Sequence, residues 1–234
     1  MIASYTDAAS RYADTGLYTL PIAARLIAAN RRHLRSWVIG NSNSDAAPII
    51  MRQLPDIGGD PVLGFLDLIE TAFVRHFRVL GYSPQTIRKV AQKLRRKHDV
   101  EHPFAMDKRF RADGKAIFEE SIEDDGERRI LNLMNDNFEI PSVIERSLFE
   151  QVLYANDIAG QWRPSLSFPK VLLNPRVAFG DPVIDGVWIP TRTLREAVHA
   201  DGSIEEVADE FGISVDDVRQ AFGWEKELDL RTLH

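Results

Sequence analysis

Two short amphipathic segments separated by a tight break constrain the fold of the N-terminal region more than any other feature of the sequence. The first opens with Thr19 as its cap and Pro21 in its first turn, where a missing N–H costs nothing. The second follows Asn30, a favourable N-cap residue, and stops before Gly40, which is placed to end a helix. Apolar residues recur at helical spacing in both segments. The pattern therefore predicts a helix-turn-helix.

The second of these predicted helices has a cationic outer face. Its apolar residues recur at i, i+3 and i+4 and predict one buried side, made of Leu34, Trp37 and Val38. The other positions are basic or polar, as in a recognition helix that enters the major groove of DNA. The expected groove-facing residues are Arg31, Arg32, His33 and Arg35. A plain αα-hairpin without DNA binding remains the alternative.

Charge is divided unevenly along the 234 residues. Residues 1–115 contain 18 Lys and Arg against 11 Asp and Glu, a net charge of +7, whereas residues 116–234 contain 11 against 24, a net charge of −13. Residues 71–98 hold eight cations and no acid. Because surface helices usually pair opposite charges, this run favours a phosphate-binding surface over a solvated helix face. The cations expected to position phosphates are Arg88, Lys89, Lys93, Arg95, Arg96 and Lys97.

Two longer helices are predicted in this basic half. Apolar spacing predicts one from Phe65 to near residue 81, and Ser83 with Pro84 predicts the start of the next. A short strand is expected at residues 49–54.

A hairpin is predicted after these helices. Asp113 and Gly114 form a strong two-residue turn between β-prone stretches. A basic hairpin that follows a helix-turn-helix predicts the wing of a winged helix, which reaches along the DNA backbone or minor groove. The expected wing contacts are Arg109, Arg111 and Lys115.

The acidic half reads as short strands followed by helices. From Trp162 onward, strands broken by Pro and Gly are predicted, and Thr191 and Ser203 are expected to cap helices. The last helix begins with Asp216 and Asp217, which would repel phosphate, so this second helix-turn-helix pattern favours a protein–protein role.

No catalytic motif is recognisable. The chain has no cysteine and lacks the P-loop, the dinucleotide fingerprint, the nucleophile elbow and the His-Glu-x-x-His zinc motif, so we expect no enzyme, no metal and no cofactor. The stretch from His98 to His102 offers two imidazoles and a carboxylate to a metal, and an enzyme using it is one alternative; a solvated linker is favoured. With no signal peptide and no membrane span visible, a cytoplasmic location is expected.

One stretch of the acidic half has a recognisable signature, Gly180-Asp181-Pro182-Val183-Ile184 followed by Gly186-Val187-Trp188-Ile189-Pro190-Thr191. With the rest of residues 174–191 and with residues 201–208 and 211–214, it resembles a bacterial family of unknown function, DUF433, which is common among antitoxins. The resemblance covers about residues 165–228, and Trp188 departs from the smaller or basic residue usual there. The resemblance implies a fold and no catalysis.

The basic half contains five recognisable pieces: Tyr18-Thr19, Ala23-Ala24-Arg25-Leu26, Leu34-Arg35-Ser36-Trp37, Phe65-Leu66-Asp67-Leu68-Ile69-Glu70 and Gly81-Tyr82-Ser83-Pro84-Gln85-Thr86-Ile87-Arg88. Together they resemble the MerR-type winged helix. A winged helix of this type followed by DUF433 is similar to the large VapB-type antitoxins, which are encoded beside a VapC toxin, a PIN-domain ribonuclease.

The resemblance implies an antitoxin that silences a VapC-like PIN-domain toxin and binds operator DNA to repress its own operon, as a homodimer. The alternative is a stand-alone MerR-like regulator without a toxin, which uses the acidic half only to dimerise. The expected fold is mainly α with small β elements (α+β). We expect a winged-helix domain at residues 1–120, a connecting region at 121–164, and a DUF433-type domain of small strands and three helices at 165–234.

Overall fold

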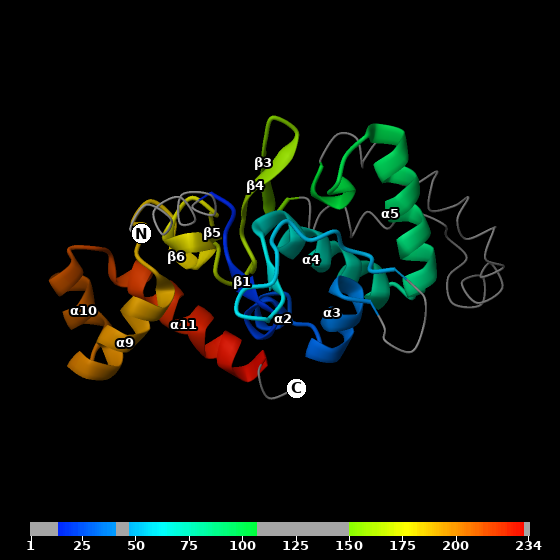
Figure 1. Cartoon of the computed structure of the whole chain (residues 1–234). Coiled ribbons are helices and arrows are strands. Elements are labelled where there is room, and N and C mark those ends of the chain that lie inside the picture. Colours follow the sequence, from blue (N-terminus) through cyan, green and yellow to red (C-terminus); the bar gives the residue numbers. More distant parts are fainter. Residues whose placement is uncertain (1–13, 41–46, 107–149, 232–234) are drawn as a thin grey trace, which may run out of the picture.

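The computed structural model describes residues 14–40, 47–106 and 150–231. These residues form seven α-helices and two small antiparallel sheets, so the fold is α+β, as predicted. Four helices from the basic half lie on one side, three C-terminal helices lie on the other, and the larger sheet lies between them (Figure 1). None of the described helices combines the length and the apolarity needed to cross a bilayer.

The predicted helix pair is confirmed. Strand β1 (Tyr18–Thr19) leads into α2 (Leu20–Leu26), and α3 (Arg31–Val38) follows after a four-residue turn. Asn30 caps α3, because its side-chain oxygen accepts a hydrogen bond from the N–H of Arg32 at 2.9 Å. Thr19 occupies the N-cap position of α2, but its side chain makes no capping hydrogen bond.

Helices α4 (Phe65–Val79) and α5 (Pro84–His98) also lie where the sequence predicts them. Ser83 caps α5 by accepting a hydrogen bond from the N–H of Thr86 at 3.0 Å. Between α5 and the next described strand lies the 3-10 helix η1 (Pro103–Ala105). Both α4 and α5 bury an apolar side in a core shared with α2 and α3, and both pack against η1.

The strand expected at residues 49–54 is wrong. Strand β2 is Val62–Leu63 and pairs with β1. The N–H groups of Ile49 and Ile50 both donate to the carbonyl of Trp37, at 2.8 and 3.1 Å. This segment satisfies its backbone by binding the end of α3, so a loop forms where its apolar residues predict a strand.

The larger sheet has the antiparallel order β3-β4-β5-β6. Its strands are β3 (Val152–Ala155), β4 (Ile158–Trp162), β5 (Val171–Leu173) and β6 (Pro182–Ile184). The 3-10 helix η3 (Ala178–Gly180) joins the last two strands. The sheet thus begins before residue 165, within the segment that the sequence analysis assigns to a connecting region.

Three helices end the chain: α9 (Thr191–Asp201), α10 (Ile204–Phe211) and α11 (Val215–Arg231). Ser203 caps α10, as predicted, through the N–H of Glu206 at 3.1 Å. The prediction that Thr191 caps α9 is wrong, because Pro190 holds the cap position. Thr191 is fully buried, and its hydroxyl donates to Glu225 on α11.

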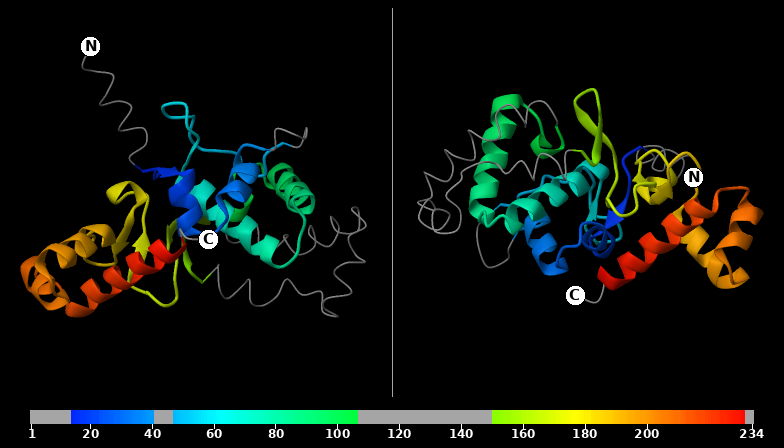
Figure 2. Two further views of the ribbon diagram at one scale, coloured as in Figure 1. Left: turned by 90° about the horizontal axis from the view of Figure 1, so that it is seen from below. Right: turned by 180° about the vertical axis from the view of Figure 1, so that it is seen from behind.

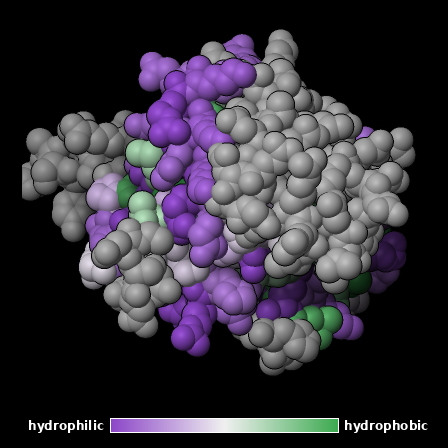
Figure 3. All heavy atoms as spheres, turned by 90° about the vertical axis from the view of Figure 1, so that its right-hand side faces the viewer, coloured by the Kyte–Doolittle hydropathy of each residue, from purple (hydrophilic) through white to green (hydrophobic). Residues whose placement is uncertain are grey.

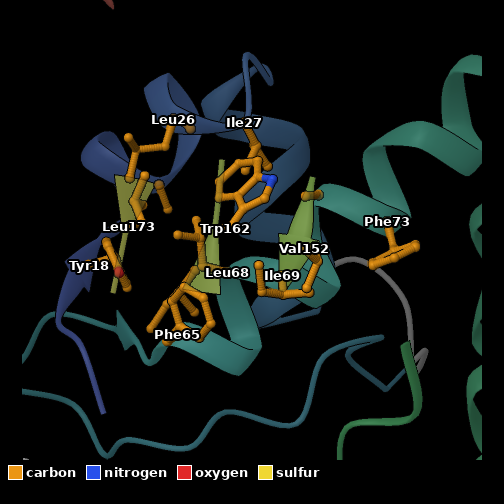
Figure 4. Close-up of a cluster of buried hydrophobic side chains, with 14 of the residues drawn as sticks. Tyr18, Leu26, Ile27, Phe65, Leu68, Ile69, Phe73, Val152, Trp162 and Leu173 are labelled. Atoms are coloured by element: carbon orange, nitrogen blue, oxygen red, sulfur yellow. The ribbon is translucent and has the colours of Figure 1, made fainter. Parts of the chain in front are cut away.

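One apolar core runs through both halves. Val152 and Trp162 of the sheet pack beside Ile27, which follows α2, and beside Leu68 and Ile69 of α4 (Figure 4). A hydrogen bond also joins the two halves along this seam between them: the Tyr18 hydroxyl donates to the Gly180 carbonyl at 2.9 Å. The two halves are therefore packed together through a shared core.

Candidate nucleic-acid interface

Helix α3 presents a cationic face to solvent. Leu34, Trp37 and Val38 are buried, as the spacing predicts. Arg31, Arg32, His33 and Arg35 are all exposed. Within the described part of the chain, the three arginine side chains of α3 have no hydrogen bond or ion pair. An exposed helix with unpaired guanidinium groups can bind phosphate and base edges without first breaking internal contacts.

The turn between α2 and α3 is covered by two arginines from distant elements. Arg75 of α4 donates through Nε to the carbonyl of Ala28 at 2.8 Å. Arg231, the last residue of α11, donates through Nη1 to the carbonyl of Leu26 at 2.8 Å. The carbonyl end of α2 carries partial negative charge, and these guanidinium groups neutralise it beside the N-terminus of α3.

A cleft of about 710 Å³ opens between α2, the start of α3 and the end of α11. Its walls also include Pro21, Ala24, Ala29 and Asn30. Five arginines line it: Arg25, Arg31, Arg32, Arg35 and Arg231. Figure 2 shows the end of α11 beside α2 and near α3 in two views. A concave surface lined by one sign of charge concentrates the electrostatic potential and attracts anions.

The six cations predicted on α5 differ in their surroundings. Arg96 and Lys97 are exposed, and the other four are half-buried. Arg88 donates through Nε to the carbonyl of Ala47 at 2.5 Å, and Arg95 donates to the carbonyls of Ile49 and Glu101, each at 2.8 Å. Arg88 and Arg95 thus anchor the neighbouring loops. The described surface on the α5 side is mostly hydrophilic (Figure 3).

The predicted wing lies in a part of the chain that the structure does not describe. Arg109, Arg111 and Lys115, together with the turn at Asp113 and Gly114, lie outside the described residues.

A buried polar network lies beneath α5. His102 Nδ1 lies 3.4 Å from Glu70 Oε2, and Glu70 also accepts a hydrogen bond from the N–H of Phe104 at 3.1 Å. Burial lowers the pKa of His102, but the hydrogen bond to Glu70 and the charges of Glu70 and Asp67 outweigh it, so the pKa is raised overall. The expectation of a solvated linker is wrong at His102, because this imidazole is buried beside the carboxylates of Glu70 and Asp67.

Asp67 belongs to the same network. Burial raises the pKa of its carboxyl to about 6, although hydrogen bonds from the N–H groups of Gln53 and Gly64 lower it. The described residues contain no group of three or more His, Asp or Glu placed to hold a metal ion.

Asp216 and Asp217 are paired. Lys170 Nζ lies 2.7 Å from a carboxylate oxygen of each. Asp217 also accepts a hydrogen bond from the Ser214 hydroxyl at 2.6 Å, at the start of α11. The start of α11 is therefore less negative than the sequence indicates.

Sequence reasoning missed three arginines of this interface: Arg25, Arg75 and Arg231. Arg75 belongs to the acid-free run, which was the one available signal for it. Arg231 lies 205 residues after Leu26, whose carbonyl it binds, and no local sequence pattern predicts that hydrogen bond.

Comparison with known proteins agrees with this architecture. Residues 171–224 match the family model described as "Protein of unknown function (DUF433)". The chain is 28% identical over 225 residues to a Mycobacterium tuberculosis protein named "Putative antitoxin VapB45", which covers 89% of this chain and 93% of the relative. It also resembles the crystal structure of Rv2018 from Mycobacterium tuberculosis, with a TM-score of 0.70, 25% identity and coverage of 89% and 97% of the two chains. The resemblance to a VapB-type antitoxin with a DUF433 region is thereby confirmed.

Proposed function

We propose that this chain is an antitoxin that binds and neutralises a VapC-like PIN-domain ribonuclease, and that it binds operator DNA as a homodimer to repress its own operon. The observation that carries the antitoxin role is similarity to VapB45 over nearly the whole of both chains. An antitoxin acts by binding, so this proposal includes no catalysis.

The DNA-binding role is supported by α3. A recognition helix needs exposed polar and cationic side chains outside and a few apolar anchors inside. Arg31, Arg32, His33 and Arg35 are exposed while Leu34, Trp37 and Val38 are buried, which meets both requirements. We assign the α5 cations Lys89, Lys93, Arg96 and Lys97 to phosphate contacts, and Arg109, Arg111 and Lys115 to the wing of a MerR-like domain.

The toxin-binding role is assigned to the acidic half. Residues 116–234 carry a net charge of −13. A ribonuclease needs a cationic surface to hold RNA, and an acidic antitoxin surface would complement it and speed their encounter.

Co-expression with the gene adjacent to its own tests the antitoxin role. We expect that gene to encode a PIN-domain protein that arrests growth, and we expect this chain to restore growth and to co-purify with it. Soluble chain that neither restores growth nor binds the adjacent product contradicts the antitoxin role. If such a chain still binds its own upstream DNA, the stand-alone regulator is the better description.

Titration of upstream DNA at several salt concentrations tests the DNA-binding role separately. We expect affinity to fall steeply with added salt, because phosphate contacts release counterions. Affinity that does not respond to salt contradicts the assignment of these cations.

A further inference from the structure

We infer that the arginine-lined cleft between α2, the start of α3 and the end of α11 binds a backbone phosphate of duplex DNA, and that Arg231 of the C-terminal helix is part of this site. The inference rests on the proposed DNA binding and extends it. It assigns a direct DNA contact to the half of the chain that the sequence reserves for a protein partner.

Two of the cleft's arginines are held in fixed positions. Arg25 Nη2 lies 3.1 Å from Asp229 Oδ1. Arg231 donates to the carbonyl of Leu26, pairs with Glu227, and lies with its Cζ 5.0 Å from the centre of the Trp224 ring. Guanidinium groups fixed before binding lose little conformational entropy when a phosphate arrives.

The cleft's other three arginines come from α3 and complete the site. Their side chains have no partner among the residues that the structure describes, so a phosphate can recruit them directly. Guanidinium groups bind phosphate oxygens through paired, charge-assisted hydrogen bonds.

The surroundings of the cleft add to its positive potential. Arg75 covers the Ala28 carbonyl beside it, and its pKa is lowered by burial and by the nearby charge of Arg231. An anion bound beside Arg75 and Arg231 would reduce the electrostatic repulsion between them. No acid among the described residues lines the cleft, and Glu227 and Asp229, which pair with Arg231 and Arg25, lie outside its lining.

The shape of the cleft favours duplex DNA over a free phosphate ion. At about 710 Å³ it is far larger than one phosphate group needs, and it shares its three α3 arginines with the exposed recognition face. If α3 lies in the major groove, the DNA backbone at the edge of that groove would place its phosphates beside the N-terminal end of this helix.

The test uses the full chain, a short random-sequence DNA duplex and a salt series. Arg231→Gln should weaken duplex binding roughly tenfold and lower the salt slope by about one, as loss of one charged phosphate contact predicts. Arg231→Lys should recover part of the loss, because it keeps the charge. Arg219→Gln is the matched control: it removes the same charge from an exposed position on α11, about 18 Å away along the helix axis.

Glu227→Gln guards against a trivial loss of folding. It removes the acid that pairs with Arg231 but keeps the contacts of Arg231 with the Leu26 carbonyl and the Trp224 ring, so it should tighten duplex binding roughly two- to threefold and raise the salt slope. Tighter binding by a variant that unfolds at the same temperature as the unaltered chain would support the site directly, because a loss of folding would then be ruled out.

The outcomes separate this inference from the proposed function. If Arg32→Ala weakens duplex binding while Arg231→Gln and Glu227→Gln match the Arg219→Gln control, the cleft assignment is overturned and DNA binding by α3 stands. If the unaltered chain binds no duplex, the DNA-binding role itself fails. If inorganic phosphate stabilises the chain against heat and the loss of this effect in Arg231→Gln is its only change, the site belongs to a free phosphate and the duplex assignment is overturned.

Discussion

The C-terminal half of the molecule and helix α3 of the N-terminal half differ in how their cations are paired. In the C-terminal half, Lys170 binds Asp216 and Asp217, Arg163 binds Asp185 at 2.6 Å, and Arg195 binds Asp229 at 2.8 Å. In the N-terminal half, the arginines of α3 face solvent with no partner among the described residues. The net charges of the two halves therefore do not show the whole difference, because they do not say which cations are already paired. Charges that are neutralised internally shape the fold, and those left unpaired are available to a ligand.

Arg25 and Arg231 connect these two regimes. Each is held by an acid on α11, yet both line the cleft beside α3. The C-terminal helix thus packs against α2 and contacts the carbonyls at the start of the α2–α3 turn. Four predictions examine this comparison, from the largest expected effect to the smallest.

The seam between the halves should be the most sensitive point. At Gly180 an added Cβ would lie 2.1 Å from the Tyr18 hydroxyl oxygen, and φ is +87°. Gly180→Ala should lower the free energy of unfolding by about 3 kcal/mol, through overlap together with backbone strain. Gly186→Ala is the control, because its φ is +81° and nothing lies within 4 Å of its added Cβ. It should cost only about 1 kcal/mol in the same urea titration; equal losses would contradict the tight seam.

A paired and an unpaired arginine of the basic half should fail in different ways. Arg95→Ala leaves the carbonyls of Ile49 and Glu101 without their donor and removes the cation 3.6 Å from buried Glu70. It should lower the free energy of unfolding by about 2 kcal/mol. Arg32→Ala should leave unfolding within about 0.5 kcal/mol and weaken operator binding instead. Calorimetry and DNA titration on both variants check this, and a reversed pattern would contradict the comparison.

The buried network should make stability depend on pH. Burial raises the pKa of Asp67 to about 6. Burial lowers the pKa of His102, but the hydrogen bond to Glu70 and the nearby carboxylates raise it by more, so both groups bind protons more tightly in the folded chain. Their contribution to the free energy of unfolding is therefore largest at low pH. It is lost as the pH rises past each folded-state pKa.

His102→Gln should remove part of this dependence. The variant should unfold about 1 kcal/mol more easily at pH 6, since it loses a buried hydrogen bond, and the difference should shrink at higher pH. Thermal unfolding across this pH range checks the sign. A difference that grows with pH would show that His102 is neutral in the fold.

The smallest effect should come from Lys170. Its ion pairs with Asp216 and Asp217 are partly exposed, so Lys170→Met should cost less than about 1 kcal/mol at neutral pH. Burial raises the pKa of Asp217, but Lys170 and Ser214 lower it by more, so the pKa lies below its ordinary value in the folded chain. The stabilisation from this ion pair is therefore present above the carboxyl's ordinary pKa and is lost in acid. The variant and the parent should converge in stability as the pH falls. Divergence in acid would contradict the pairing.

Local signals in the sequence predicted the helices of the basic half well. Asn30 and Ser83 satisfy the first N–H groups of α3 and α5, and a helix start of this kind depends only on neighbouring residues. Thr191 was misjudged because a hydroxyl can also bond across the fold, and its buried position opposite Glu225 decided the outcome.

The cleft could be predicted only in part. Three of its five arginines lie on α3 and follow from helical spacing. Arg25 and Arg231 enter it because α11 packs against α2, a contact between segments about 200 residues apart. His102 was missed for the same reason, since its carboxylate partners lie on α4.

Separation of the two proposed roles in one strain tests the account most directly. The chain with Arg31, Arg32 and Arg35 all changed to alanine would be co-expressed with the adjacent gene and with a reporter under the upstream operator. The account predicts that growth is restored as by the unaltered chain while the reporter is no longer repressed, because the unpaired arginines act on DNA and the acidic half acts on the toxin. Repression that persists in this variant, or growth that fails although the variant is folded and soluble, would contradict it.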